Sequence, residues 1–327
     1  MNRIATKITS TLAAIGALLF AMQASAQNAW PQKPITVVVP FAAGGVADVL
    51  ARIVGEKATK SLGQPLVFEN RSGAGGNTGI ATVARAAGDG YTLGIGTAGA
   101  LTINPHLYKA KMPFDALKDI KPLVIMATQP NIIVVNNKLP VTTLGELIAY
   151  LKANPDKESY GSSGVGTSQH LCMELLAQET GIKAAHVPYR ASNQILQDLI
   201  SGQINIACDN FAAAYEQVKA GTVRALAVTT LKPYAASPEV PTAASTIPGF
   251  EVSVFHGYIA PASLPDEIAE RAIADIKAAV NDPEVQAKLR VLGVEPSGLA
   301  GAEFASFIKL QYDKWGAVVE KAGLKLQ

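Results

Sequence analysis

The chain has few of the residues that carry metal, redox or disulfide chemistry. Its 327 residues include only two cysteines, Cys172 and Cys208. Two cysteines are too few for a disulfide scaffold, although an oxidising compartment permits one bridge between them. We expect instead two small buried apolar residues that do not meet. The four histidines lack the paired spacing of a zinc site, so we expect no metal and no cofactor. They are His106, His170, His186 and His256.

An excess of charge of one sign is also lacking. The chain has 28 lysines and arginines and 26 aspartates and glutamates. Two of the basic residues, Arg3 and Lys7, lie in the first ten residues, so the rest of the chain carries no formal net charge. A neutral chain without a basic tail has no electrostatic footprint for nucleic acid. We therefore expect no nucleic-acid partner.

No apolar run is long enough to cross a bilayer. The longest, Thr11–Met22, has about 12 residues, whereas a span requires ~20. It follows Arg3 and Lys7 and precedes Ala24-Ser25-Ala26, the layout of a secretory signal peptide with an A-x-A cleavage site. We expect residues 1–26 to be a signal peptide that is removed after Ala26, and the mature protein to be periplasmic. Nucleotide cofactors are scarce there, which favours binding proteins and secreted hydrolases.

Strand and helix patterns alternate along the rest of the chain, which predicts an α/β fold with largely parallel sheets. The predicted strands at residues 35–39, 66–70 and 91–95 each run into a loop of small residues. A second α/β block begins near residue 132, and within it Thr143 is predicted to cap a helix over residues 144–153. Because the carboxyl ends of neighbouring parallel strands line one crevice, we expect the loops to converge on a site.

Two of the predicted strand–helix junctions suit an anion. Phe41-Ala42-Ala43-Gly44-Gly45 follows the first strand, and Ser162–Ser168 precedes the helix predicted over residues 169–180. Helix N-termini and glycine-rich turns offer free backbone N–H groups, and the helix dipole favours negative charge. The second loop adds hydroxyl groups. The alternative for this loop is an ordinary N-cap at Thr167 or Ser168.

Enzyme motifs are incomplete in this sequence. Gly94–Gly99 matches G-x-G-x-x-G, but Pro105 would interrupt the long helix that a Rossmann site requires. Gly161–Val165 lacks the final glycine of a nucleophile elbow, and Ser168 and His170 are poorly spaced for a catalytic pair. We expect no enzyme activity, with a secreted hydrolase built from distant residues as the alternative class.

Four charged residues near the predicted loops have competing interpretations. Asp209, at the end of a predicted strand, either contacts a ligand group or water, or fixes a loop. Arg71 and Arg190 either pair with a second ligand carboxylate or form structural ion pairs, and we favour the latter. Asp48 either interacts with the first turn of its own helix or contacts the ligand, and we favour the former.

Six segments are informative as an ordered set: Trp30–Ile35, Val39–Asp48, Glu69–Asn77, Asp89–Leu93, Tyr160–Ser168 and His186–Tyr189. Together they resemble the Bug family, the periplasmic solute-binding proteins of tripartite tricarboxylate transporters. The resemblance implies an α/β, two-lobed periplasmic-binding-protein fold of type II, the Venus flytrap, with crossing hinge strands. It assigns residues 27–127 plus 252–327 to lobe 1 and residues 128–251 to lobe 2.

The resemblance also implies a function. The protein would capture a small dicarboxylate, tricarboxylate or aromatic carboxylate and deliver it, as a monomer, to the membrane subunits of a transporter. A receptor for a sensor kinase is the alternative. One ligand carboxylate would be held between the lobes, partly through ordered water. The ligand-binding residues carried over are Phe41, Ala43, Gly44, Thr97 and Gly99 from lobe 1, and Val165, Gly166, Thr167, Ser168, His170 and Asp209 from lobe 2.

Overall fold

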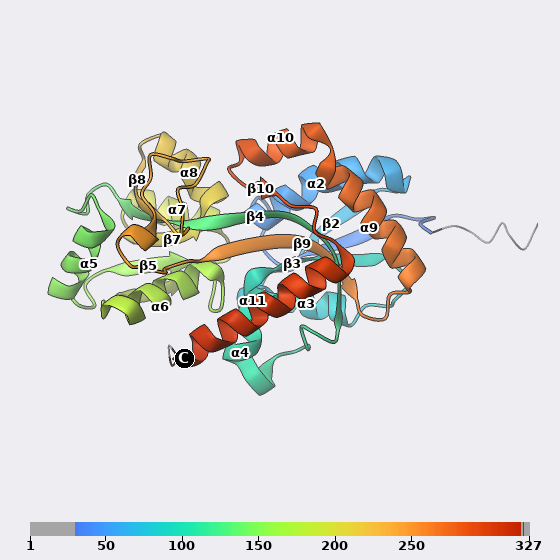
Figure 1. Cartoon of the computed structure of the whole chain (residues 1–327), viewed down its shortest axis with the longest axis horizontal. Coiled ribbons are helices and arrows are strands. Elements are labelled where there is room, and N and C mark those ends of the chain that lie inside the picture. The colour runs from blue at the N-terminus through green and yellow to red at the C-terminus, as the bar shows by residue number, and fades with distance from the viewer. Residues whose placement is uncertain (1–29, 322, 324–327) are drawn as a thin grey trace, which may run out of the picture.

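The chain folds into two α/β lobes joined by crossing strands (Figure 1). The computed structural model describes residues 30–321 and 323, so the predicted signal peptide lies outside the described residues. The strand order β2-β1-β3-β9-β4-β7-β5-β6 runs from one lobe into the other. The predicted two-lobed α/β architecture is confirmed.

Lobe 1 contains the parallel strands β1 (Ile35–Val39), β2 (Leu66–Asn70) and β3 (Thr92–Thr97). The apolar run of β1 is almost completely buried, as expected for a central strand with helices on both faces. The helices around this sheet are α2 (Val46–Leu62), α3 (Asn77–Ala84), α9 (Asp266–Asn281) and α10 (Pro283–Val291). A short strand, β10 (Glu295–Pro296), follows them.

The chain after β3 is helical, whereas the sequence predicts a loop of small residues. Gly99–Ile103 forms a π-helical turn that leads into α4 (Asn104–Tyr108). Pro105 is tolerated because it lies in the first turn of α4, where a backbone N–H has no helical acceptor. The helical segment is short, and it differs from the long helix of a Rossmann site.

Lobe 2 contains β5 (Ser159–Ser162), which is parallel to β6 (Ala185–Pro188) and β7 (Ile206–Asn210). It also contains β8 (Val223–Val228). Its helices are α5 (Leu144–Ala153), α6 (Ser168–Thr180), α7 (Ser192–Ser201) and α8 (Phe211–Lys219). Thr143 caps α5 in a capping box with Glu146, as predicted.

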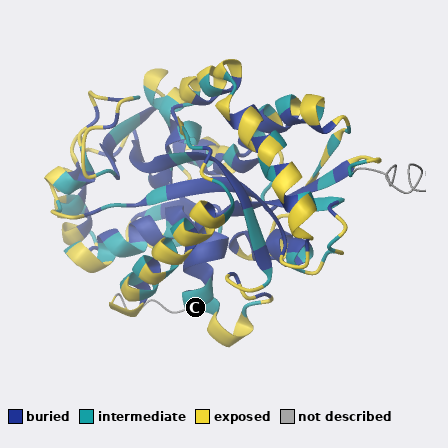
Figure 2. Ribbon diagram, turned by 45° about the vertical axis from the view of Figure 1, so that its right-hand side comes forward, coloured by how far each residue is buried: buried dark blue, intermediate teal, exposed yellow. Residues whose placement is uncertain are grey.

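Two antiparallel strands cross between the lobes. β4 (Ile120–Asn136) pairs with β9 (Ser253–Pro261) in lobe 1 and with β7 and β8 in lobe 2. The prediction of largely parallel sheets is wrong for these strands, because a chain that crosses to lobe 2 and returns must reverse direction. Figure 2 shows that both crossing strands are largely buried. The predicted lobe boundary at residue 128 falls inside β4, so the boundaries stay a prediction.

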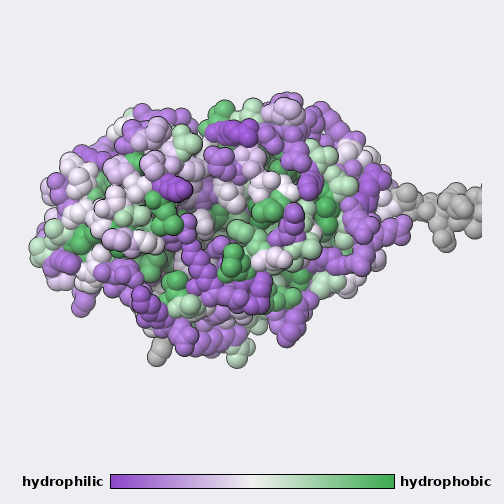
Figure 3. Space-filling view, in the orientation of Figure 1, coloured by the Kyte–Doolittle hydropathy of each residue, from purple (hydrophilic) through white to green (hydrophobic). Residues whose placement is uncertain are grey.

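The last helix, α11 (Gly301–Lys321), starts near the lobe 1 end of the crossing strands and runs below them in the view of Figure 1. Its residues Phe304 and Ile308 pack in a cluster of lobe 1, whereas Trp315 and Val319 pack in a cluster made mostly of lobe 2 residues. The surface seen in Figure 3 is mostly hydrophilic, with hydrophobic residues scattered over it. No helix within residues 30–321 combines the length and the apolar character that crossing a membrane would require.

Candidate functional site

The loop Phe41–Gly45 connects β1 to α2 and is fixed by polar side chains. Asn70, at the end of β2, donates from Nδ2 to the Phe41 carbonyl at 2.9 Å and to Asp48 Oδ1 at 3.0 Å. The buried Asp48 also accepts from Gly44 N at 3.0 Å and from Arg52 Nε at 2.9 Å. Burial opposes ionisation, but these hydrogen bonds, Arg52 foremost, hold the pKa of Asp48 below its usual range. As expected, Asp48 organises the first turn of α2.

The N–H group of Gly44 therefore donates to Asp48 and is not free to bind an anion. No side chain caps α2, whose N-cap residue is Gly45. The first N–H groups of a helix lack helical acceptors, and the dipole favours an anion beside them. The N–H groups of this junction that have no side-chain cap thus lie at Val46 and Ala47, just beyond the predicted Gly44.

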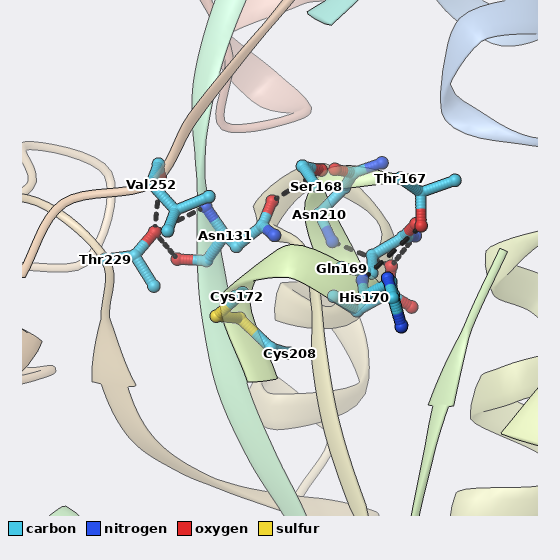
Figure 4. The surroundings of a disulfide bond; sticks show 11 residues. Asn131, Thr167, Ser168, Gln169, His170, Cys172, Cys208, Asn210, Thr229 and Val252 are labelled. Atoms are coloured by element: carbon cyan, nitrogen blue, oxygen red, sulfur yellow. Dashed lines mark hydrogen bonds between the residues drawn. A yellow bond between two sulfur atoms is a disulfide. The ribbon is translucent and has the colours of Figure 1, made fainter. Parts of the chain in front are cut away.

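The second loop, Ser162–Thr167, also bonds to itself. Thr167 is the N-cap of α6, and its Oγ1 accepts from His170 N at 3.4 Å and donates to Gly164 O at 2.8 Å. Ser168 Oγ donates to Asn131 Oδ1 of β4 at 3.5 Å (Figure 4). The N-cap interpretation is therefore correct for Thr167. Both hydroxyls are buried and shape the loop.

Two histidines lie behind this loop. His186 Nε2 lies 2.6 Å from Ser162 Oγ, and the rings of His170 and His186 are 4.4 Å apart. Burial lowers the pKa of each histidine to about 4, so both are neutral at pH 7. The contact between Ser162 and His186 is not a catalytic pair, because the serine is completely buried and its hydroxyl also bonds Gly164.

The two lobes touch through glycines that have no room for a side chain. A Cβ on Gly166 would lie 1.7 Å from Asn104 Oδ1, and one on Gly99 would lie 2.8 Å from the Gly166 carbonyl oxygen. A Cβ on Gly75 would lie 2.3 Å from the Val165 carbonyl oxygen. Three predicted site residues, Gly99, Val165 and Gly166, thus lie in the contact between the lobes.

A small cavity lies between the lobes. Its volume is ≈ 30 Å³, room for about two water molecules. Its wall residues are Phe41, Gly45, Val46 and Ala47 from lobe 1, Ser163, Gln169, Ala191, Ser192 and Asn210 from lobe 2, and His256 from β9. The wall contains no lysine or arginine, so an anion there would meet N–H groups, hydroxyls, amides and an imidazole. Within the described residues, no three metal-binding side chains gather as a metal site would require.

Two open grooves continue the cavity. One, of ≈ 360 Å³, shares Gly45, Val46 and Ser192 with it and is lined mainly by apolar residues. The other, of ≈ 580 Å³, shares Phe41 and Ser163 and is lined also by Arg190. Arg71 instead pairs with the surface residue Glu69 at 2.8 Å, which is the structural ion pair we expected.

Asp209 connects the start of three helices. Its Oδ1 accepts from Gln169 Nε2 of α6, Ser192 Oγ of α7 and Asn210 N before α8, each at 2.7 Å. Asp209 is completely buried, and its Oδ2 has no partner. Burial raises the pKa of this carboxyl against the effect of the three hydrogen bonds. Asp209 therefore fixes the loops through Oδ1, as one of its two interpretations expects, and contact of Oδ2 with a ligand group or water stays a prediction.

Unpartnered polar atoms concentrate around the cavity and the crossing strands. In β-sheet register, Thr97 lies opposite His256 and Asn131 lies opposite Asn210. A buried polar group without a partner costs free energy, so such a group of atoms marks a place where a ligand or water supplies the missing bonds. The atoms are Thr97 Oγ1, Gln129 Nε2, Asn131 Nδ2, Asp209 Oδ2, Asn210 Oδ1 and His256 Nδ1.

The predicted site residues occupy different places around this region. Phe41 lines the cavity, Gly44 and Val165 line the grooves, and Ala43 lines none of the three spaces. Sequence reasoning missed four side chains of the wall: Gln169, Ser192, Asn210 and His256. Two of them could have been predicted: Ser192 follows a strand–helix junction, and Asn210 is the neighbour of the predicted site residue Asp209. His256 is outside the set of predicted site residues, because its place in the wall depends on how the crossing strands pair.

Cys172 and Cys208 form a disulfide, and the expectation that they stay apart is wrong (Figure 4). Their Cα atoms are 6.2 Å apart because α6 packs on β7. Their separation of 36 residues in the sequence does not reveal this packing. The bond ties α6 to the strand that ends in Asp209.

The sequence matches the family described as "Tripartite tricarboxylate transporter family receptor" over residues 50–324. Solved structures are similar to it over most of its length. The periplasmic binding protein BugD is 32% identical with a TM-score of 0.87, covering 91% of this chain and 100% of its own. This similarity confirms the predicted periplasmic-binding-protein fold.

Two similar structures contain a ligand. Rpa4515 of R. palustris, solved with adipate, is 35% identical with a TM-score of 0.87, covering 91% of this chain and 100% of its own. MatC (Rpa3494) from Rhodopseudomonas palustris, with bound malate, is 29% identical with a TM-score of 0.84. The match covers 89% of this chain and 100% of MatC. Both ligands are dicarboxylates.

Proposed function

This chain belongs to the receptor family of tripartite tricarboxylate transporters, and from that membership we propose that it captures a small organic carboxylate between its lobes and delivers it to the membrane subunits of such a transporter. It is a solute-binding receptor and not an enzyme. The adipate of Rpa4515 and the malate of MatC support a dicarboxylate as ligand. Tricarboxylates and aromatic carboxylates complete the proposed range.

The observation that carries this proposal is the uncapped start of α2 at the wall of a cavity with unpartnered polar atoms around it. A carboxylate there would accept from Val46 N and Ala47 N, and lobe 2 would close over it. The proposed site keeps the predicted residues Phe41, Ala43, Gly44, Thr97, Gly99, Val165, Gly166, Thr167, Ser168, His170 and Asp209, and adds Gln169, Ser192 and Asn210.

Export to the periplasm, cleavage after Ala26 and a monomeric state are parts of the same proposal. The N-terminal pattern of Arg3, Lys7 and an apolar run supports export. Mass spectrometry of protein secreted to the periplasm should give a mature N-terminus at Gln27.

A carboxylate panel tests the function. Malate, adipate, citrate and benzoate should be screened by thermal shift, and at least one should raise the melting temperature, since a ligand that binds the folded state stabilises it. The methyl ester of the same compound should not do so. If no carboxylate raises the melting temperature, the proposed function is wrong.

A matched pair of variants tests the position of the carboxylate. Val46→Pro removes the first N–H of α2, and proline suits this position because Gly45 before it is extended, with ψ 164°. Val46→Ala removes a similar side chain and keeps the N–H. A hydrogen bond to a charged group is worth ~1.5–3 kcal/mol, so Val46→Pro should bind the carboxylate about ten- to a hundredfold more weakly than Val46→Ala in calorimetry. Equal affinities would remove the start of α2 from the site.

A further inference from the structure

His256 is the only titratable side chain among the wall residues of the cavity. It lies on the crossing strand β9, opposite Thr97 of β3, and is only 3% exposed. Its Nδ1 is enclosed and has no partner, while the ring borders the cavity. The Nε2 edge is therefore the one that a molecule in the cavity can reach.

Among the wall residues of the cavity, His256 is the only one whose side chain can carry a positive charge. Across the cavity, Asp209 of β7 bonds the wall residues Gln169 and Ser192. On α2, Asp48 and Arg52 bond to each other, and β3 and α3 contain no titratable residue. Glu295 of β10 is exposed to solvent. On the other side of the crossing strands, Lys314 of α11 bonds Glu251.

Burial lowers the pKa of His256 to about 4, so the ring is neutral at pH 7 when the cavity holds no anion. The cavity as it stands has room for about two water molecules, so a dicarboxylate must widen it. With one carboxylate at the start of α2, the second one then meets a wall without lysine or arginine. A buried charge without a partner is costly, and a neighbouring anion favours the protonated form of an imidazole.

We propose that His256 is the residue that selects a second carboxylate of the ligand, donating to it from Nε2 and taking up a proton from solvent as the ligand binds. This inference rests on the proposed function. It assigns the ligand to the dicarboxylates and makes binding proton-linked. Since the complex then holds more protons than the free protein and ligand, affinity should rise as the pH falls.

The test is calorimetry with adipate and monomethyl adipate between pH 6 and 8, in two buffers of different ionisation enthalpy. Adipate should bind the wild type with proton uptake, and its affinity should fall as the pH rises, by no more than about tenfold per pH unit for one proton. The monoester should show neither effect. In His256→Gln, which keeps a neutral donor, adipate at pH 6 should bind ten- to a hundredfold more weakly and without uptake.

His106→Gln is the matched control, because His106 lies outside the cleft and bonds the Tyr312 carbonyl. It should bind adipate like the wild type. The inference is overturned if the wild type takes up no proton, if His256→Gln keeps the pH dependence, or if Asp209→Asn alone abolishes the uptake. Equal losses for adipate and its monoester in His256→Gln would show a structural role and overturn it as well. A wild type that binds no carboxylate at any pH would instead disprove the proposed function.

Discussion

Gly166 lies where the loop of lobe 2 meets Asn104 of lobe 1, with a φ of +81°. At this position even a methyl group would collide with the Asn104 side chain. The lobes would then close only if Asn104 gave up its bond to Asn77, in which Nδ2 donates to Oδ1 at 2.7 Å. A single residue without a side chain thus permits the contact between the lobes.

Gly166→Ala should weaken ligand binding at least about tenfold, because a clash that costs more than about 1.4 kcal/mol now opposes closure. The affinity for a carboxylate, measured by calorimetry, checks this. Gly181→Ala is the control. Gly181 directly follows α6, the helix that Gly166 precedes, and it has a φ of +74° with no atom within 4 Å of the new Cβ. Because alanine is strained at both positive φ values, Gly181→Ala should lower the melting temperature about as much as Gly166→Ala, but it should leave the affinity unchanged. Similar affinities for both variants would contradict the prediction.

Asp209 should make the stability of the protein depend on pH. Burial raises the pKa of its carboxyl, so the folded state keeps the proton where the unfolded chain, with a pKa of about 3.9, has lost it. The stabilisation is complete below the unfolded pKa and is lost as the pH rises through the folded one. The melting temperature of Asp209→Asn relative to the wild type should therefore increase between pH 4 and 7.

Asp48→Asn should behave in the opposite way. The pKa of Asp48 is lowered, so its carboxylate stabilises the fold above the unfolded pKa and loses this effect as the pH falls through the folded one. The variant should be less stable than the wild type at pH 7, and the difference should shrink on acidification. Parallel melting curves across pH for wild type and both variants would show that neither carboxyl has a shifted pKa.

Among the elements, α6 and β7 are the pair that positions most of lobe 2's part of the site. The start of α6 carries Thr167 as its N-cap, the end of β7 carries Asp209, and the disulfide joins the two elements. Gln169 adds a second connection through its bond to Asp209. A change that loosens α6 should therefore disturb both the loop before it and the position of the Asp209 side chain.

Reduction of the disulfide should destabilise the protein. A crosslink across 36 residues is worth about 4 kcal/mol in the chain-entropy model. The denaturation midpoint in urea should fall when a thiol reductant is present during unfolding and refolding. The double variant Cys172→Ala/Cys208→Ala should resemble the reduced protein and no longer respond to reductant. A midpoint of the wild type that reductant does not change would mean that the two cysteines are not bonded in solution.

At the scale of the whole molecule, the strands β4 and β9 and the helix α11 connect the lobes within the described residues. β4 and β9 are paired along the lobe 1 side, and α11 packs its first half on lobe 1 and its second half mostly on residues of lobe 2. Gln178 of α6 donates to the Lys321 carbonyl at 3.1 Å at the end of α11. Opening the cleft therefore requires the crossing strands to bend and α11 to move with them or separate from α6.

The ligand-free protein should be more open in solution than the protein with a carboxylate bound, since only closure brings both lobes to one ligand. Small-angle scattering should show a smaller radius of gyration at saturating ligand. Gly166→Ala should need at least about tenfold more ligand to reach the smaller value. An unchanged radius in the wild type with a ligand confirmed by calorimetry would indicate a rigid, preformed site.

The sequence by itself determined the features that depend on neighbouring residues. The buried run of β1, the glycine-rich start of α2 and the capping box of α5 each lie within a few residues of chain, so backbone propensities and capping suffice to specify them. The order of strands and helices and the two loops at the cleft follow from the same local signals. The ordered motifs also identified the family.

Tertiary structure alone decided how distant segments meet. The first half of β4 becomes a strand because β9, more than a hundred residues later, pairs with it, and the same pairing brings His256 opposite Thr97. The disulfide forms because α6 packs on β7, and Gly44 loses its free N–H because Asp48 folds back on the loop. Each of these features depends on contacts between segments rather than on local backbone propensity. A local sequence pattern does not show which distant segment will pack beside it.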